Sequence, residues 1–414
     1  MADNSQLLAE RKKRYFDCVE LKKPDRVPIA PLAEFFPARL KNYTVKEVMY
    51  NHDLMSEAWL YYHEKYQPDQ SQNPFRLRGF GPLLETLDFQ HLKWAGHGLP
   101  DNMAYQFVEL ELLKVEEYDH FINDMSDFML RRYIPRVCKS LAAFEKLPPF
   151  SAQFSYFWGL FWPTAFLDPE VAKAVESVRE AALAGAKLLA AGRELEGKYQ
   201  AAGFPPSSGG YTQAPFDTLS DVLRGTKGLM LDMRRCPDKI MAACEKILPL
   251  MINAALGAAK ASGCPITFIP LHKCMDTFMS QAQFEKFYWP HFQELLQELC
   301  RNGLYPWVLV EGNCDNRLNS FRNVPEGKIV WHIEGSNLRK AKEAFRGVSC
   351  IRGNLPVSVL VMGSPDDVRA ECKKILDLMK DDGGFIFDTG VNIGDARFEN
   401  VDAMFDYVRE HGVY

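Results

Sequence analysis

The feature that most restricts the fold is a regular alternation of short apolar runs and helix-like segments after residue 264. Apolar runs at 266–269, 307–310, 329–333, 348–351 and 385–387 have the length and composition of buried strands. Segments with a helical pattern at 281–301, 337–345, 365–379 and 400–411 separate or follow them. Strands that alternate with helices predict a parallel sheet whose strands are joined by crossover helices.

Two earlier segments that read as strands, at 27–32 and 151–156, bring the strands close to the number that a closed barrel requires. We therefore predict an α/β fold, a (β/α)8 TIM barrel formed by a single domain over residues 1–414. A mostly helical pattern predicts an N-terminal insertion at about 37–148. An open doubly wound sheet is the alternative, although no strand is followed by the Gly-x-Gly-x-x-Gly turn of a dinucleotide-binding fold.

Composition excludes several classes of partner. The net charge of -5 and the pI near 6.0 give no basic surface for nucleic acid or for an anionic membrane. The 10 cysteines are scattered and no secretory signal precedes them, so we expect reduced thiols and a cytoplasmic protein. We also expect no membrane span, because the longest apolar candidate, 181–191, is short and contains Lys187.

A barrel enzyme carries its chemistry at the carboxyl ends of its strands, so the residues that end each predicted strand are the candidates. Most of them are acid–base groups or metal ligands, as the barrel hypothesis predicts. They are Glu34, Tyr156, His272 with Cys274, Glu311, His332 with Glu334, Asn354 and Asp388.

His272, Cys274 and Glu311 together predict a zinc site. His272 and Cys274 follow one apolar run at a spacing that places both side chains on the same side, and Glu311 ends the next run. One imidazole, one thiolate and one carboxylate leave a fourth position open, which is typical of catalytic zinc. Cys314, three residues after Glu311, is a reserve ligand, whereas His332 and Asp388 fit a substrate contact or an outer hydrogen bond better.

Each of these residues also has a purely structural interpretation. His272 alone fits a hydrogen-bonded core histidine, and Cys274 alone fits an inert buried thiol. Glu311 alone could pair with Lys273 or Arg317. The aromatic run at 154–162 is dense enough to line an apolar pocket, although aromatic residues also gather in cores.

Several short motifs resemble the uroporphyrinogen decarboxylase superfamily of (β/α)8 barrels, in order and spacing over nearly the whole chain. They are Pro24-Asp25-Arg26-Val27-Pro28, Met279-Ser280-x-x-x-Phe284, Glu311-Gly312-Asn313, Gly353-Asn354-Leu355-Pro356, Gly363-Ser364-Pro365 and Gly383-Gly384-Phe385-Ile386. The arginine-rich N-terminal signature of the decarboxylase is absent, and Ala33-Glu34-Phe35-Phe36 stands after the first strand instead. The chain therefore lacks the arginines with which the decarboxylase binds its porphyrinogen substrate.

The methyltransferase branch of that superfamily is the better match. The segments 93–100, 105–109, 117–119 and 271–276 resemble methyltransferase I of anaerobic O-demethylase systems. The resemblance implies transfer of the methyl group of a phenyl methyl ether to the Co(I) corrinoid (cobalamin) of a partner protein. Zinc would bind the ether oxygen, and a homodimer is left open.

For such a substrate, the candidate residues of the chain supply the expected contacts. Tyr156, Trp158, Phe161 and Trp162 would hold the aromatic ring, and His332 and Asp388 would contact the substrate. Asn313 or Tyr211 would bind a polar substituent of the ring.

One departure from the family pattern bears on the reaction. The thiol-methylating members carry a further cysteine near the last strand, where this chain has Gly390-Val391-Asn392. Glu311 is the replacement that we expect. The alternatives are a methyl-corrinoid:thiol methyltransferase, a decarboxylase without metal, and a corrinoid-binding protein that is not an enzyme.

Overall fold

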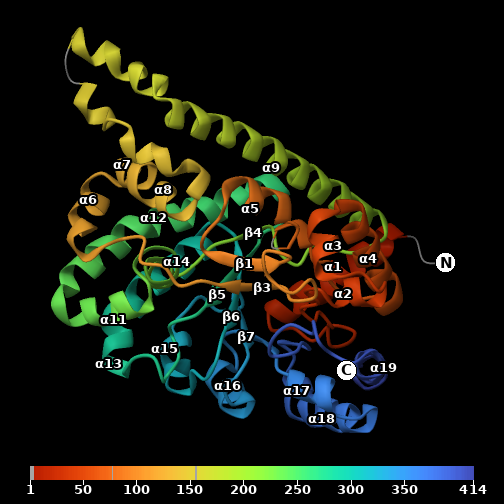
Figure 1. The fold of residues 1–414 in the computed structure, drawn as a ribbon. Helices are drawn as coiled ribbons and strands as arrows, with labels where there is room; N and C mark the ends of the chain where they lie inside the picture. The colour runs from red at the N-terminus through yellow and green to blue at the C-terminus, as the bar shows by residue number, and fades with distance from the viewer. Residues whose placement is uncertain (1–3, 77, 154–155) are drawn as a thin grey trace.

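The computed structural model describes residues 4–76, 78–153 and 156–414, and its centre is a parallel sheet in chain order (Figure 1). The sheet contains six strands, each hydrogen-bonded to the next, and every pairing is parallel. They are β4 (Gly210–Tyr211), β5 (Ile266–Leu271), β6 (Tyr305–Val310), β7 (Val330–Ile333), β8 (Cys350–Gly353) and β9 (Phe385–Ile386).

Two extended segments without regular strand structure close this sheet into a barrel. The first pairs with the end of β9 through a parallel bridge between Ile29 and Phe387. The second segment contains Asp69, whose amide donates to the carbonyl of Ile29 in the first segment over 2.9 Å. Ser71 then bridges to Pro206, just before β4. With these two segments the sheet closes on itself, which confirms the predicted (β/α)8 TIM barrel.

The C-terminal helices cover the outside of the barrel because their apolar faces pack on the strands. Helix α18 illustrates the local signals, since Ser364 caps its first turn and Pro365 fits its first position. The elements outside the insertion are α1 (Asn4–Val19), α2 (Phe36–Leu40), α3 (Val45–Tyr50), α4 (His52–Tyr66), α10 (Pro215–Asp217), η7 (Thr218–Arg224), α11 (Thr226–Arg235), α12 (Pro237–Ser262), α13 (Gln281–Gln283), η8 (Phe284–Tyr288), α14 (Trp289–Arg301), η9 (Asp315–Arg317), α15 (Leu318–Phe321), α16 (Leu338–Phe345), α17 (Val357–Met362), α18 (Pro365–Met379), η10 (Lys380–Asp382) and α19 (Phe398–His411).

A long insertion separates the second barrel segment from the third. Because Asp69 and Ser71 belong to the barrel, the insertion runs from about 73 to 204, which differs from the predicted 37–148. Its elements are η1 (Pro74–Arg76), α5 (Gly81–Leu87), β1 (Leu92–Ala95), β2 (Gly98–Leu99), β3 (Tyr105–Phe107), η2 (Val115–Glu117), α6 (Tyr118–Asn123), α7 (Met125–Phe128), η3 (Met129–Tyr133), α8 (Ile134–Val137), η4 (Lys139–Lys146), η5 (Phe150–Gln153), η6 (Trp158–Leu167) and α9 (Pro169–Ala201).

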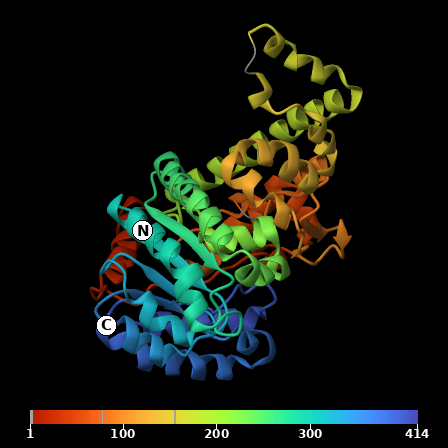
Figure 2. The ribbon, with the colours of Figure 1, turned by 90° about the vertical axis from the view of Figure 1, so that its left-hand side faces the viewer.

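The predicted strand at 151–156 is wrong. Residues 150–153 form the 3-10 helix η5, and 154–155 lie outside the described residues. Figures 1 and 2 show residues 150–153 in an arm that projects from the barrel, where none of the described strands lies beside them. Pairing partners, not alternation alone, decide whether a short segment is a strand.

A polar layer fills the centre of the barrel. Arg352 on β8 donates from Nε to Asp388 Oδ2 over 2.6 Å, and its guanidinium lies 3.9 Å from the ring centroid of Trp307. His332 on β7 donates from Nε2 to the carbonyl of Thr389 over 2.7 Å and accepts a hydrogen bond from Trp307 Nε1 over 3.3 Å. Arg352, Asp388 and His332 are completely buried, so hydrogen bonds within the layer replace those to water.

Helix α12 is the one described helix that is long and apolar enough to cross a membrane by length and composition, and a third of its most apolar window is buried. Sequence inspection missed it because charged residues near its start interrupt the run. In the fold α12 connects β4 to β5 and packs on the outside of the barrel beside α14. A helix that packs its apolar face on a barrel can therefore be as long and as apolar as a helix that crosses a membrane.

Candidate functional site

Asp217, at the end of α10, fixes the backbone that follows β5. Its carboxylate accepts the amides of His272 and Lys273, each over 3.0 Å, and the hydroxyl of Tyr288 over 2.6 Å. The side chain of Asp217 is completely buried, so these three donors replace its hydration. The loop that carries His272 is therefore held in one conformation by a residue from the preceding strand–helix unit.

The imidazole of His272 lies between two carboxylates. Its Nδ1 is 2.5 Å from Asp221 Oδ2, one helical turn after Asp217, and its Nε2 faces Glu311 Oε1 at 3.6 Å. Lys273 completes the cluster with Nζ 2.8 Å from Asp221 Oδ1. Among the described contacts, Glu311 therefore pairs with neither Lys273 nor Arg317. The side chains of His272 and Glu311 are 28% and 40% exposed, so both remain accessible to solvent rather than enclosed in the core.

The charges of this cluster depend on one another. Burial and the neighbouring carboxylate of Asp221 raise the pKa of Asp217 to about 6. Burial also raises the pKa of Glu311, although the charge of His272 opposes this shift. Burial alone would lower the pKa of His272, but the hydrogen bond to Asp221 and the carboxylates of Asp217 and Glu311 raise it to about 9. The space beside Nε2 thus favours a positive charge.

Cys274 points to a different neighbour. Its sulfur lies 3.2 Å from the sulfur of Cys314, and both side chains are completely buried. Burial and the contact with Cys314 raise the pKa of the Cys274 thiol well above its usual value. In the part of the chain that the structure describes, no three His, Cys, Asp or Glu side chains lie close enough together to hold one metal ion. The predicted ligands therefore meet only in part: His272 faces Glu311, and Cys274 faces Cys314.

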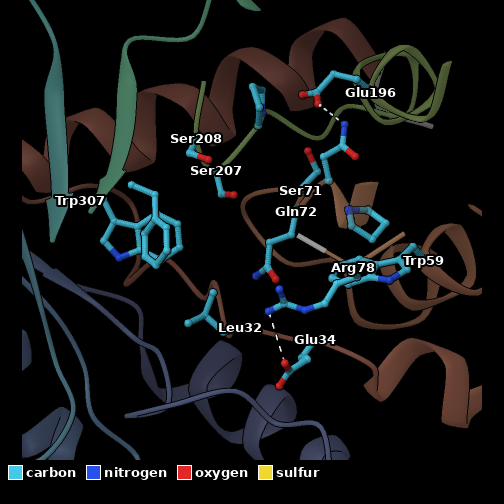
Figure 3. Close-up of a pocket in the computed structure, with 14 residues that line it drawn as sticks. Leu32, Glu34, Trp59, Ser71, Gln72, Arg78, Glu196, Ser207, Ser208 and Trp307 are labelled. Atoms are coloured by element: carbon cyan, nitrogen blue, oxygen red, sulfur yellow. Dashed lines mark hydrogen bonds and ion pairs between the residues drawn. The ribbon is translucent and has the colours of Figure 1, made fainter. Parts of the chain in front are cut away.

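A small cavity of about 70 Å³ opens between the first five barrel segments and the insertion (Figure 3). Trp307 forms one wall, next to Phe268, whose ring centroid is 4.5 Å away. Glu34 and Arg78 lie on the other side, 3.5 Å apart. The remaining lining residues are Leu32, Trp59, Ser71, Gln72, Asn73, Pro74, Glu196, Pro206, Ser207 and Ser208. The lining mixes aromatic rings, serines and a pair of opposite charges, which suits a small amphipathic molecule.

The structure separates the other predicted substrate contacts. Tyr211 on β4 is partly exposed, and its ring centroid is 6.2 Å from that of Phe268, beside the cavity. Asn313 lies in the exposed loop after Glu311, where its side chain accepts the amide of Asp315 over 3.0 Å. His332 and Asp388 belong to the polar layer inside the barrel, and neither lines the cavity of Figure 3.

The predicted aromatic contacts lie in the projecting arm. Tyr156 is 96% exposed, and Phe161 and Trp162 are also exposed. The side chain of Trp158 lies outside the described part of the chain. Figures 1 and 2 place this segment at the far end of the arm, whereas Glu311 and His272 follow the central strands β6 and β5. The structure therefore does not bring these aromatic residues to His272.

Sequence reasoning missed Asp217 and Asp221, which organise the site. Their i, i+4 spacing places both carboxylates on one face of a helical segment that begins just after β4. Two carboxylates so close to a strand end were the available signal. It was overlooked because residues 205–210, rich in proline and serine, suggested only a loop, so the strand before the two residues was not recognised.

Comparison with known proteins agrees with this architecture. Residues 206–411 match the family model described as uroporphyrinogen decarboxylase (URO-D). A solved methyltransferase from Methanosarcina mazei superposes with a TM-score of 0.62 at 16% identity, covering 97% of this chain and 98% of that one. A B12-independent methionine synthase from Shewanella sp. W3-18-1, in complex with selenomethionine, gives a TM-score of 0.35 at 12% identity, with 48% and 61% covered.

The search of curated proteins found no match. At the identities found, the solved structures bear on the fold alone. The chain therefore carries a uroporphyrinogen decarboxylase-like region over residues 206–411, within a (β/α)8 fold that a methyltransferase shares over nearly its whole length.

Proposed function

We propose that this chain is a methyltransferase that moves the methyl group of a phenyl methyl ether to the Co(I) corrinoid of a partner protein. The observation that carries the proposal is His272, clamped between Asp221 and Glu311 at the carboxyl ends of β5 and β6. This is the end of the barrel where such folds perform chemistry. The sequence motifs of the O-demethylase branch and the shared fold support the same assignment.

Zinc is the metal that we propose for this site. His272 and Glu311 supply two facing donors, and Asp221 on Nδ1 is the outer carboxylate that orients a metal-bound histidine. The third proposed ligand, Cys274, joins them only if its side chain turns away from Cys314. When bound, zinc supplies a Lewis acid for the ether oxygen.

The chain's own residues would bind and orient the substrate. Phe268 and Trp307 offer apolar rings against which an aromatic ring can stack. Tyr211, whose ring lies beside that of Phe268, is the proposed partner for a polar substituent of the ring. Asp217 keeps the amides of His272 and Lys273 in place, so the imidazole does not need to be ordered when the substrate arrives.

The matched family model favours one alternative, a decarboxylase. Such an enzyme needs cations for its carboxylated substrate, and three arginines near the site are already engaged. Arg78 lies beside Glu34, Arg352 binds Asp388, and Arg317 donates to the carbonyls of Cys274 and Met279. This arrangement supports the methyltransferase over the decarboxylase.

The test is a methylation assay with the purified chain and a corrinoid protein reduced to Co(I). We expect a phenyl methyl ether such as a methoxybenzoate to convert the Co(I) spectrum to that of methyl-Co(III). His272→Ala and Glu311→Gln should abolish the conversion, and Glu326→Gln, at an exposed loop carboxylate, should not change it.

The other outcomes identify the alternatives. If only thiols exchange methyl groups with the corrinoid, the protein is a thiol methyltransferase. Release of CO2 from a carboxylated substrate without cobalt would establish the decarboxylase. Elemental analysis tests the metal separately: we expect one zinc per chain in the wild type and none in His272→Ala. A zinc content unaffected by both His272→Ala and Cys274→Ala contradicts the proposed ligands.

A further inference from the structure

The arm formed by residues 139–201 has no evident partner within the described chain along its outer side. Its main element, α9, contains 33 residues and is therefore about 50 Å long. Figures 1 and 2 show that the N-terminal part of α9 and the turns before it extend well beyond the barrel. Ordering a projection of this length costs conformational entropy, which contacts with another molecule can offset.

The end of the arm, residues 156–167, exposes several large apolar side chains. No residue between 147 and 167 is charged. Tyr156, Phe157, Leu160 and Leu167 are 96%, 78%, 72% and 81% exposed. With about 200 Å² for each large side chain, they present on the order of 600 Å², already as large as the largest apolar patch of a typical monomer. This arm tip therefore needs to be enclosed by another molecule.

The middle of α9 carries a second exposed apolar surface. Val175, Ala182 and Leu189 recur at seven-residue intervals, so they lie on one side of the helix, and all three are exposed. Lys187 is the only charged residue between 181 and 192. A Cβ at Gly185 would meet no atom within 4 Å, so a second helix can approach closely there. Such a repeat is typical of a helix that pairs with another helix.

The opposite end of α9 borders a pocket of about 220 Å³ that is lined by apolar residues and also by polar ones, including Lys12, Gln70 and Ser262. Tyr15, Phe16, Pro205, Pro206 and Ile266 form its apolar wall. Gln200 of α9 also lines it and lies about five turns beyond Ala182, on the same side of the helix. We name this cavity the α1 pocket. It has room for one or two aromatic or leucine side chains.

We propose that a second copy of this chain covers these surfaces, with the two α9 helices antiparallel and the arm tip of each chain in the α1 pocket of the other. Ala182 then lies at the two-fold axis, because it is midway along the chain between the arm tip and Gln200. Val175 of one copy meets Leu189 of the other. In a two-fold symmetric dimer of this kind, each copy contributes both its arm tip and its α1 pocket, so this contact occurs twice.

The combination of surfaces favours a second copy over a lipid bilayer. A membrane would enclose the arm tip but leave the side of α9 and the α1 pocket uncovered. A partner with an apolar helix and an apolar projection at the matching distance covers all three, and this chain itself has both. Together, the exposed apolar surfaces of the arm tip and of α9 reach the ~800 Å² that each partner buries in a stable interface.

Light scattering after size-exclusion chromatography tests the dimer with the full chain. We expect a mass of twice the 47.3 kDa of one chain. Phe157→Asp/Leu160→Asp at the arm tip and Leu189→Asp on α9 should each give monomers with unchanged circular dichroism. Leu183→Asp is the matched control, because Leu183 is 59% exposed on the same helix but is rotated by about 100° from Ala182.

Cross-linking tests the register of the dimer. In Ala182→Cys the two introduced thiols meet at the axis, so mild oxidation should give a disulfide-linked dimer on a non-reducing gel. Ala172→Cys, an exposed position near the start of α9, should give none. A monomeric wild type overturns the proposal, and arm-tip-dependent sedimentation with neutral phosphatidylcholine vesicles would identify a membrane as the occupant. A dimer that Ala182→Cys does not cross-link refutes the antiparallel pairing.

Discussion

The buried pair of Arg352 and Asp388 allows the sharpest test of the barrel interior. Both side chains are completely buried, and Arg352 Nε lies 2.6 Å from Asp388 Oδ2. In Arg352→Met the carboxylate keeps the amide of Thr389 at 2.6 Å but loses its only charged partner among the described contacts. Removing one member of a buried pair costs roughly 3–5 kcal/mol, because the other charge remains uncompensated.

The double variant isolates that cause. Arg352→Met/Asp388→Asn removes both charges, so its free energy of unfolding should lie about 2 kcal/mol or more above the value expected from adding the two single losses. Urea denaturation followed by tryptophan fluorescence measures all four proteins, because Trp307 lies against Arg352. Arg346→Met is the control: Arg346 is 71% exposed in a surface pair with Asp382, and we expect a change within about 0.5 kcal/mol.

Two results would refute this reasoning. A loss below about 1 kcal/mol for Arg352→Met would mean that the interior carboxylate is solvated or protonated at no cost. Simple additivity in the double variant would mean that the two side chains do not interact in the folded protein. Either result would show that charge pairing does not stabilise the polar layer.

Three further outcomes follow from the site and from the buried histidines. Asp221→Asn should slow methyl transfer by about 10–100-fold, with the loss in kcat rather than in KM, because His272 loses the carboxylate on its Nδ1; an unchanged kcat contradicts an orienting role. Tyr288→Phe removes one of three donors to the buried Asp217 and should lower the free energy of unfolding by about 1–3 kcal/mol in urea titrations; no loss would show that water replaces the hydroxyl. Burial lowers the pKa of His63 from 6.5 to about 4, so as the pH falls His63 is protonated in the unfolded chain before it is protonated in the folded one. The stability that depends on neutral His63 is complete above pH 6.5 and is lost as the pH falls through about 4, and the thermal midpoint of His63→Leu should fall less than that of the wild type between pH 7 and 4.5.

Hydrophobic pattern predicted the C-terminal half of the barrel because strands β5 to β9 are buried on both faces. Continuous apolar runs such as 307–310 are typical of strands in that position. The second barrel segment, around Asp69 and Ser71, and the third, before β4, were missed for the opposite reason. Their side chains are polar or proline and face the cavity and the ion pairs of the barrel, so they lack an apolar signature.

The site was predicted in part for a related reason. The ends of β5 and β6 marked His272 and Glu311, since chemistry in a barrel follows strand ends. The direction of the Cys274 side chain could not be read from spacing, because the chain leaves the strand after Leu271 and alternation no longer holds. The aromatic run at 154–162 was assigned to the site by composition, yet the long-range course of the insertion places its described part, 156–162, in the arm.

The contacts of Asp217 also define what can be exchanged between related barrels. A single carboxylate from one strand–helix unit holds two amides of the next unit and the hydroxyl of Tyr288 in the helix of that unit. A graft of the β5 loop alone would therefore arrive without the acceptor that shapes it. The smallest segment that carries a functional site into another barrel runs from β4 through η8, so recombination within residues 210–288 should yield folded but inactive chimeras.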